Sequence, residues 1–192
     1  MTQLVDTLLD NLEKNAGAKV MEKAQAIQLL VMDVDGVHTD GGLIHGAEVA
    51  QFKRFHARDG FGMKLLRKHA IPMAFITGRT SQVVEERASE IGATICLQGI
   101  QEKGPALLQV CEEMNMAPAQ TAYIGDDLID LPAMQHVGLA IATADAHPLV
   151  AAVAHWQTSQ PGGSGAVRDA CELILHAQGK LRSVYADYWP CD

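Results

Sequence analysis

The chain has 192 residues, of which 48% are hydrophobic and 20% are charged. This length and composition fit one globular domain that can bury a sizeable core. A formal net charge of -8 argues against broad nucleic-acid binding, which needs a basic face to displace counterions from the phosphate backbone. We therefore expect no nucleic-acid partner, and any anionic substrate must be held by local positive groups.

The termini and cysteines indicate where the protein works. Acidic residues interrupt the leucines near the N-terminus, and no apolar run is long enough to span a bilayer. The cysteines are widely spaced, without a CxxC pair or zinc-finger spacing: Cys96, Cys111, Cys171 and Cys191. We expect a soluble, cytoplasmic protein with reduced thiols and no membrane partner.

The N-terminal residues predict a helical arm. Leucine and valine recur at helical spacing from Leu4 to Leu12, ahead of a loop near Gly17. We expect residues 1–24 to form this arm, docked on the body or on a neighbouring subunit. Residues 25–182 would then form the main domain and residues 183–192 a C-terminal tail.

Short apolar runs alternate with helix-like segments through the rest of the chain. The first run, Ile27 to Met32, is continuously apolar, as expected for a strand buried on both faces of a parallel sheet. The other runs are at residues 71–76, 94–97, 121–124 and 137–141, and the helical segments are at roughly 60–69, 81–91, 103–114 and 166–178. The alternation predicts an α/β fold with a Rossmann-like, doubly wound parallel sheet.

The connection after the first strand is different in kind. Gly41 and Gly42 precede the stretch LIHGAEVAQFKRF, which is broken at Gly46 and Ala47. Two short strands joined by a turn are expected there, rather than a crossover helix. We predict a projecting β-hairpin.

Asp33 and Asp35 lie directly behind the first predicted strand, in the sequence DVDG. Ligands of open α/β sheets bind at the carboxyl ends of the strands. An isolated pair of this kind would indicate only a solvated turn, but its position favours a catalytic pair. Asp33 is the candidate nucleophile, and Asp35 the candidate general acid and base for phosphate-ester hydrolysis.

Three further segments supply candidate site residues. Two carboxylates facing a phosphate dianion need a hard divalent cation between them, so we expect Mg²⁺ held by Asp33, Asp35 and Asp126. Asp126, in GDDLID, could instead belong only to an acidic helix start. Thr77, before Gly78 and Arg79, offers a phosphate cradle or an ordinary turn. Lys103 is either an exposed lysine or the group that balances phosphoryl charge.

Taken in order, DVDGV, TGR, Lys103 and GDDLID resemble the four motifs of the haloacid-dehalogenase phosphatases. The stretches RDGFG, YIGDDLIDLPAM, ADAHPL and GGSGAVRDACELILHAQGKL narrow the resemblance to the family that acts on 3-deoxy-D-manno-octulosonate 8-phosphate in lipopolysaccharide biosynthesis. The resemblance spans residues 21–181. It implies a capless homotetramer, in which the hairpin of one subunit helps to close a neighbour's active site.

The same resemblance implies particular substrate contacts. Besides Asp35 and Lys103, the implied residues are His56, Ala57, Arg58, Asp59, Gly60, Lys64, Arg79 and Arg87. The chain departs from the family pattern at His38, where an apolar residue is usual, at His56, where Asn is common, and at Ser164, where Arg is expected. These departures concern sugar contacts more than phosphoryl chemistry.

Two alternatives remain open at this stage. A related phosphatase could act on a nine-carbon, sialic-acid-type sugar 9-phosphate, because pocket changes shift chain-length preference. A non-catalytic scaffold could retain the fold, since fold alone does not establish activity. The C-terminal aromatic residues Tyr185, Tyr188 and Trp189 belong either to a frayed tail or to a segment that covers a neighbouring active site.

Overall fold

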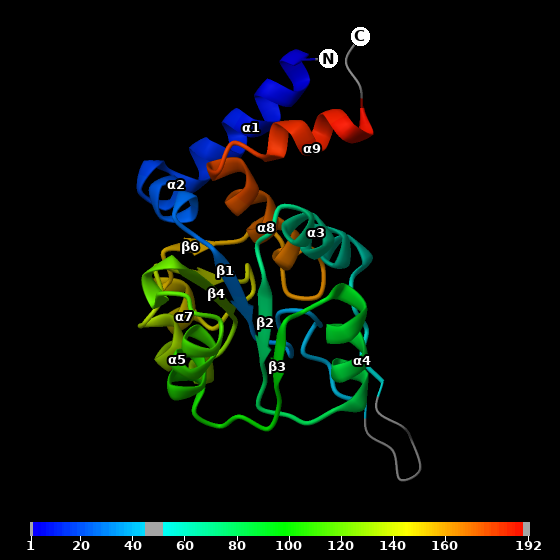
Figure 1. Cartoon of the computed structure of the whole chain (residues 1–192), viewed down its shortest axis with the longest axis vertical. Helices are drawn as coiled ribbons and strands as arrows, with labels where there is room; N and C mark the ends of the chain where they lie inside the picture. The colour runs from blue at the N-terminus through cyan, green and yellow to red at the C-terminus, as the bar shows by residue number, and fades with distance from the viewer. Residues whose placement is uncertain (1, 45–51, 190–192) are drawn as a thin grey trace.

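The computed structural model describes residues 2–44 and 52–189. Helices and short strands alternate along the chain (Figure 1). The helices are α1 (Thr2–Ala16), α2 (Ala18–Gln25), α3 (Ala57–Lys68), α4 (Gln82–Ile91), α5 (Lys103–Glu113), α6 (Leu131–Met134), α7 (Pro148–Val153), α8 (Ala166–Ala177) and α9 (Leu181–Tyr188). The 3-10 turns are η1 (Pro118–Gln120) and η2 (Leu128–Asp130).

The strands form a single parallel sheet among the described residues. They are β1 (Leu29–Met32), β2 (Met73–Ile76), β3 (Ile95–Leu97), β4 (Thr121–Gly125), β5 (Leu139–Ala142) and β6 (Trp156–Gln157). Their order in the sheet is β3-β2-β1-β4-β5-β6, so the chain winds outward in both directions from β1. The predicted doubly wound parallel sheet is confirmed, and it belongs to an α/β fold.

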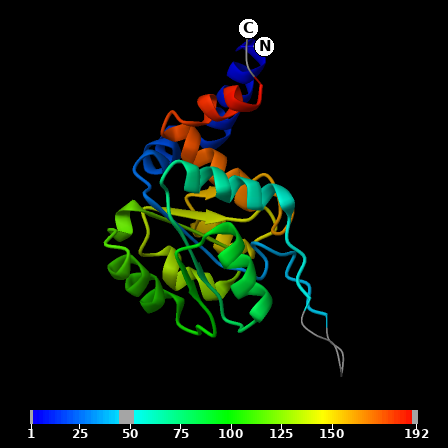
Figure 2. The same ribbon diagram turned by 45° about the vertical axis from the view of Figure 1, so that its right-hand side comes forward.

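Helices cover both faces of the sheet, because its strands are apolar on both sides. Leu30 and Met32 of β1 pack into the core under α2, α3, α4 and α8. Leu29 and Val31 point the other way, into the core under α5, α6 and α7. Figures 1 and 2 show the two helical layers on either side of the sheet. The continuous apolar run that predicted β1 therefore reflects burial on both faces.

The first and last helices of the described residues lie together at one end of the molecule. Helices α1 and α9 pack against each other and against α8, away from the end toward which the strands point (Figures 1 and 2). Residues 1–24, expected as one helical arm, contain two helices, because α2 follows α1 immediately after Gly17. Sequence patterns missed the short elements α7 and β6. Residues 181–188 form α9, so the boundary expected at residue 183 falls inside a helix.

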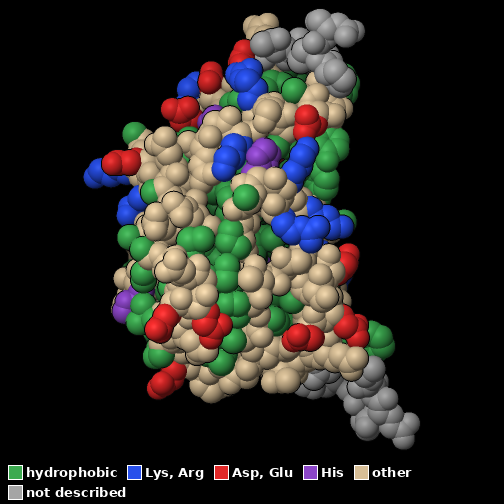
Figure 3. Space-filling view, viewed as in Figure 1, with side chains coloured by type: hydrophobic (Ala, Val, Ile, Leu, Met, Phe, Trp, Pro, Cys, Tyr) green, Lys and Arg blue, Asp and Glu red, His purple; other side chains and the backbone are tan. Residues whose placement is uncertain are grey.

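Two expectations concern the surface of the molecule. Most of the predicted hairpin around residues 43–52, namely residues 45–51, lies outside the described residues. Across the residues that are described, none of the helices is both long enough and apolar enough to cross a bilayer. On the face in Figure 3, Lys and Arg lie in the upper part together with several Asp and Glu, and the charged side chains of the lower part, toward which the strands of Figure 1 point, are mainly Asp and Glu.

Candidate active site

The central strands β1 and β4 bring two acidic loops side by side. These strands pair in register from Leu29 and Thr121 to Met32 and Ile124, and the backbone N–H of Asp33 donates to the Ile124 carbonyl. Asp33 follows β1 and is 3% exposed, and Asp126 follows β4. Carboxylate oxygens of Asp33, Asp126 and Asp130 all lie within 4.8 Å of one another.

Gly36 makes the close approach of these loops possible. Its φ of +88° lies in the left-handed region, and a Cβ there would stand 2.1 Å from Asp126 Oδ2. Only glycine adopts that backbone without strain and leaves the space for the carboxylate. The glycine of DVDG thus sets the position of Asp126 as well as the turn after β1.

Lys103 is a fully buried cation at the start of α5. Its ammonium lies 2.8 Å from Asp33 Oδ1 and 2.7 Å from Asp130 Oδ1, and its side chain is 0% exposed. Removing a lysine from water is costly unless its charge is paired and hydrogen-bonded, as it is here by two carboxylates. The structure therefore excludes the reading of Lys103 as an exposed surface residue.

Asp130 is the hub of this network. Its Oδ1 accepts hydrogen bonds from Lys103 Nζ and Tyr123 Oη, both at 2.7 Å. Its Oδ2 accepts from the backbone N–H groups of Asp126, at 3.0 Å, and Asp127, at 3.2 Å. A carboxylate has about four lone-pair positions, and all four of those on Asp130 are used. Asp130 consequently serves to hold Lys103 and the Asp126 loop.

The site has more negative charge than the protein alone balances. Burial, followed by repulsion from Asp130, raises the pKa of Asp33 to about 6 although Lys103 opposes the shift. Burial and the neighbouring carboxylates raise the pKa of Asp126 to about 8. Asp126 Oδ1 is also buried without a hydrogen-bond partner among the described residues. Oxygen ligands with surplus negative charge are what Mg²⁺ requires, so this donor set fits the ion.

Asp35 lies at the edge of the site and is ion-paired with Lys53, whose side chain is only 8% exposed. The guanidinium of Arg79, which follows β2, lies 3.8 Å from Asp35 Oδ2. That oxygen is buried and accepts no hydrogen bond among the described residues. Positive side chains from two separate loops therefore converge on Asp35.

Thr77 is buried at the carboxyl end of β2. Its backbone N–H donates to the Leu97 carbonyl, and its own carbonyl accepts from the N–H of Ile100. These bonds connect the turn after β2 to the loop after β3. Thr77 thus lies on the same edge of the sheet as Asp33 and Asp126, as parallel strands require.

The residues expected to contact substrate near α3 separate into two groups. Arg58 and Lys64 are exposed, and His56, at the N-cap of α3, is half-buried. Asp59 is instead 1% exposed and accepts a hydrogen bond from the backbone N–H of Arg168 in α8. In this conformation, Asp59 joins α3 to α8 rather than facing solvent.

Arg87 reaches from α4 toward the start of α3. A Cβ on Gly60 would stand 2.4 Å from its guanidinium, which also lies 5.3 Å from the centre of the Phe55 ring. Gly60 therefore leaves room for the arginine. The side chain of Arg87 is 14% exposed and pairs with Glu90 at 2.8 Å.

Three residues of the site were given no individual role from the sequence. Asp130 stands in the quoted motif GDDLID, and Tyr123 lies two residues before Gly125, on the same face of β4. The sequence shows both residues close to the acidic motif. Nothing in the pattern indicated that Lys103 and Tyr123 both donate hydrogen bonds to Asp130. Lys53 follows the segment expected to form a hairpin, and no sequence signal separates it from an ordinary surface lysine.

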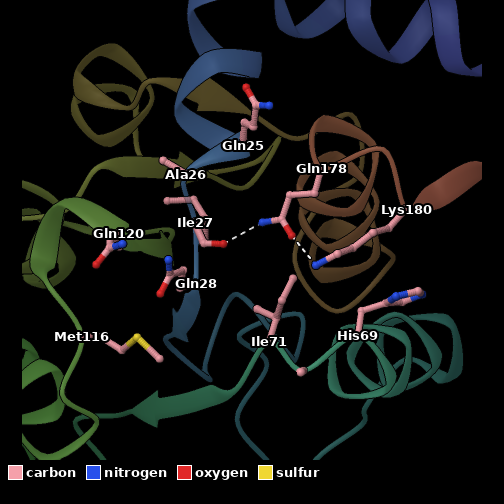
Figure 4. Close-up of a pocket in the computed structure, with 11 residues that line it drawn as sticks. Gln25, Ala26, Ile27, Gln28, His69, Ile71, Met116, Gln120, Gln178 and Lys180 are labelled. Carbon is pink, nitrogen blue, oxygen red and sulfur yellow. Dashed lines mark hydrogen bonds between the residues drawn. The ribbon is translucent and has the colours of Figure 1, made fainter.

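A hollow of about 550 Å³ lies at the opposite end of the sheet, where β1 and β4 begin (Figure 4). Gln178 donates to the Ile27 carbonyl there and accepts a hydrogen bond from Lys180. His69 and Gln120 also line this hollow. It contains none of the acidic residues at the strand ends, so the chemistry described above belongs to the other end of the molecule.

Comparisons with known proteins agree with this arrangement. Residues 89–168 match the family model of the haloacid dehalogenase-like hydrolases. The chain is 46% identical over 164 residues to the 3-deoxy-D-manno-octulosonate 8-phosphate phosphatase KdsC of Escherichia coli, a match that covers 85% of this chain and 87% of the relative. The fold and the acidic site at its strand ends are thus those of a haloacid dehalogenase-like hydrolase.

Solved structures narrow the class further. The phosphatase of the same name from Yersinia pestis has a TM-score of 0.84 and 46% identity, covering 85% of this chain and 89% of that one. Its counterpart from Moraxella catarrhalis, in complex with a magnesium ion, a phosphate ion and KDO, has a TM-score of 0.85 and 39% identity, covering 88% and 97%. The chain belongs to the 3-deoxy-D-manno-octulosonate 8-phosphate phosphatase family.

Proposed function

We propose that this chain is a Mg²⁺-dependent phosphatase that hydrolyses 3-deoxy-D-manno-octulosonate 8-phosphate to the free sugar and phosphate. The observation that carries the proposal is the group formed by buried Asp33 and Lys103 and half-buried Asp126, at the end of β1, the start of α5 and the end of β4. It occurs in a chain that is 46% identical to a phosphatase named for this substrate. A scaffold protein would have no need to bury a lysine among these carboxylates.

In the first step, Asp33 acts as the nucleophile. A carboxylate oxygen of Asp33 bonds to phosphorus, and the bond from phosphorus to the sugar oxygen breaks. Asp35 gives its proton to the departing alcohol, which leaves as the free sugar. Lys103, 2.8 Å from Asp33 Oδ1, fixes the carboxylate and contributes positive charge beside the phosphoryl group.

In the second step, the aspartyl-phosphate on Asp33 is hydrolysed. Asp35, now ionised, takes a proton from a water molecule, whose oxygen attacks phosphorus and restores the Asp33 carboxylate with release of phosphate. A magnesium ion held by Asp33, Asp126 and the backbone carbonyl of Asp35 would neutralise negative charge and orient the phosphoryl group. Thr77 would donate a hydrogen bond to a phosphoryl oxygen.

The sugar would be recognised by residues around the entrance. Arg79 lies beside Asp35 and is exposed, so it can reach a phosphoryl or carboxylate group. The remaining substrate contacts are proposed from the family pattern: His56, Ala57, Arg58, Asp59, Gly60, Lys64 and Arg87. Asp59 would take part only if its bond to the Arg168 N–H opened.

We further propose that the enzyme works as a cytoplasmic homotetramer in lipopolysaccharide biosynthesis. In such an assembly, the segment around residues 43–52 of one subunit would help to close the active site of a neighbour. Leu43, Ile44 and Phe52 are exposed apolar side chains at the two ends of that segment. Apolar side chains of this kind favour burial against another subunit. Sedimentation equilibrium at micromolar protein tests the assembly: a mass near 82 kDa supports it, and a 20.6 kDa species contradicts it.

Phosphate release tests the activity directly. The purified chain is assayed with Mg²⁺ on 3-deoxy-D-manno-octulosonate 8-phosphate and on a nine-carbon sugar 9-phosphate, beside Asp33→Asn as a control. Faster release from the eight-carbon substrate, abolished in the control, supports the proposal. Preference for the nine-carbon substrate would keep the mechanism and change the substrate, and no release from either would reject both.

A further inference from the structure

Tyr123 is a buried tyrosine behind the active site. It lies in the middle of β4 and is 0% exposed, and its hydroxyl donates a hydrogen bond of 2.7 Å to Asp130 Oδ1. It is the largest fully buried side chain among the described residues. Its ring belongs to the core under α5, which also contains Leu107 and Val110. Neither the catalytic motifs nor the proposed steps above give it a role.

The hydrogen bonds that the Asp130 carboxylate accepts indicate a specific role for the Tyr123 hydroxyl. Lys103 Nζ and Tyr123 Oη both bond to Oδ1, and Lys103 also lies 2.8 Å from Asp33. Lys103 is therefore shared between the nucleophile and Asp130. Because Tyr123 fills one of the hydrogen-bond acceptor positions of Asp130 Oδ1, Lys103 is not the only donor to that oxygen and can keep its contact with Asp33.

The same carboxylate holds the loop that carries Asp126. Asp130 Oδ2 accepts from the backbone N–H groups of Asp126 and Asp127, so a rotation of Asp130 would move this loop. Gly125 permits the contact, since a Cβ there would lie 2.5 Å from Asp130 Cβ. Burial and nearby carboxylates raise the pKa of Tyr123, which keeps its hydroxyl protonated as a donor.

We propose that Tyr123 is a positioning residue for phosphoryl transfer. Its hydroxyl fixes the rotation of the Asp130 carboxylate, which in turn keeps Lys103 on Asp33 and the Asp126 loop against the end of β1. Tyr123 itself contacts neither substrate nor the reacting atoms. This inference rests on the proposed function, and it adds a residue whose effect passes through Asp130.

Tyr123→Phe tests the proposal because it removes one oxygen atom and keeps the packed ring. We expect kcat to fall about tenfold, the size expected when a hydrogen bond worth about 1.4 kcal/mol to a charged group is lost. KM should stay within about twofold, because the substrate site is unchanged. The matched control is Thr121→Val, which removes another buried hydroxyl from the same face of β4, one bonded to the Ala117 carbonyl.

The assay separates this proposal from the proposed function. Rates are measured on the octulosonate 8-phosphate and on p-nitrophenyl phosphate, and are normalised to the folded fraction from circular dichroism. A lower kcat for Tyr123→Phe with Thr121→Val near wild type supports positioning on whichever substrate the wild type cleaves. An equal kcat in wild type and Tyr123→Phe, an equal loss in both variants, or failure of Tyr123→Phe to fold would overturn it. A wild type silent on both substrates would reject the proposed function, and the role of Tyr123 with it.

Discussion

At the scale of single residues, the active site is governed by a charge imbalance. Three carboxylates, those of Asp33, Asp126 and Asp130, lie close together beside the buried ammonium of Lys103. Asp130 is fully hydrogen-bonded, and Asp126 has a buried oxygen without a partner among the described residues. The uncompensated charge therefore falls on Asp33 and Asp126, which are the groups open to a cation.

Asp126→Asn should separate metal binding from folding. We expect activity to fall at least about 100-fold and the magnesium-induced rise in Tm to disappear, because an amide is a weaker ligand for Mg²⁺. Without metal, Tm should equal or exceed that of wild type, since one of the crowded carboxylates is gone. Thermal unfolding with and without MgCl₂ measures the two effects on Tm, and phosphate release measures the activity.

The control is Asp127→Asn, because Asp127 is exposed and its replacement should leave the magnesium-induced rise in Tm intact. A normal rise in Tm with magnesium in Asp126→Asn would contradict the assignment of Asp126 as a metal ligand.

His38 should make the protein sensitive to mild acid. Its side chain is 2% exposed and its ring centre lies 4.4 Å from that of Phe75. Burial, with a smaller effect from Arg87, lowers its pKa from 6.5 to about 3. Below pH 6.5 the unfolded chain binds a proton that the folded chain excludes, so the free energy of unfolding falls as pH drops toward 3.

His38→Leu removes this proton linkage and restores an apolar residue. Between pH 7.5 and 5.0, wild type should lose about 2 kcal/mol more unfolding free energy than the variant. Urea unfolding at the two pH values measures the difference, with exposed His136→Leu as the control. Equal losses in wild type and His38→Leu would show that another group dominates the acid response.

At the scale of elements, the turn after β1 determines where the β4 loop can lie. Gly36→Ala would introduce a Cβ 2.1 Å from Asp126 Oδ2, in addition to backbone strain at φ +88°. We expect activity to be nearly abolished. Gly17→Ala is a matched control, because Gly17 has φ +79° but nothing within 4 Å of its Cβ. Both variants should lose about 1–2 kcal/mol of stability from strain, and only Gly36→Ala should lose activity. An active Gly36→Ala enzyme would contradict this account of the turn.

The helices and strands that the sequence predicted are those with a strong local pattern of apolar residues. The run from Ile27 to Met32 gave β1 to within two residues, because burial on both faces leaves a continuous apolar signal. β6 was missed, because two residues at the sheet edge, half-buried and exposed, carry almost no pattern. The positions of Asp33 and Asp126 were predictable because parallel strands end at one edge. The contact of Tyr123 with Asp130 was not, since it depends on how a loop folds back over its own strand.

At the scale of the whole molecule, the site and the terminal helices lie at opposite ends. The strands point toward the acidic loops, while α1 and α9 pack over α8 at the other end (Figures 1 and 2). Leu9 of α1 is 6% exposed and belongs to the core under α8, and Arg182 of α9 pairs with Asp6 of α1. The arm therefore contributes packing at a distance from the chemistry.

Removal of residues 2–16 should accordingly separate stability from activity. The truncated chain loses the burial of Leu9, worth about 1.5–3 kcal/mol, and exposes apolar surface on α8 and α9, so its Tm should fall. Its kcat and KM at 25 °C should match those of wild type, because each chain supplies its acidic loops from the far end of the sheet. Leu9→Ala, which keeps the helix, should lower Tm by a smaller amount at unchanged kcat. A truncated chain that remains folded by circular dichroism but has lost its activity would instead place the arm in the active site of a neighbouring subunit.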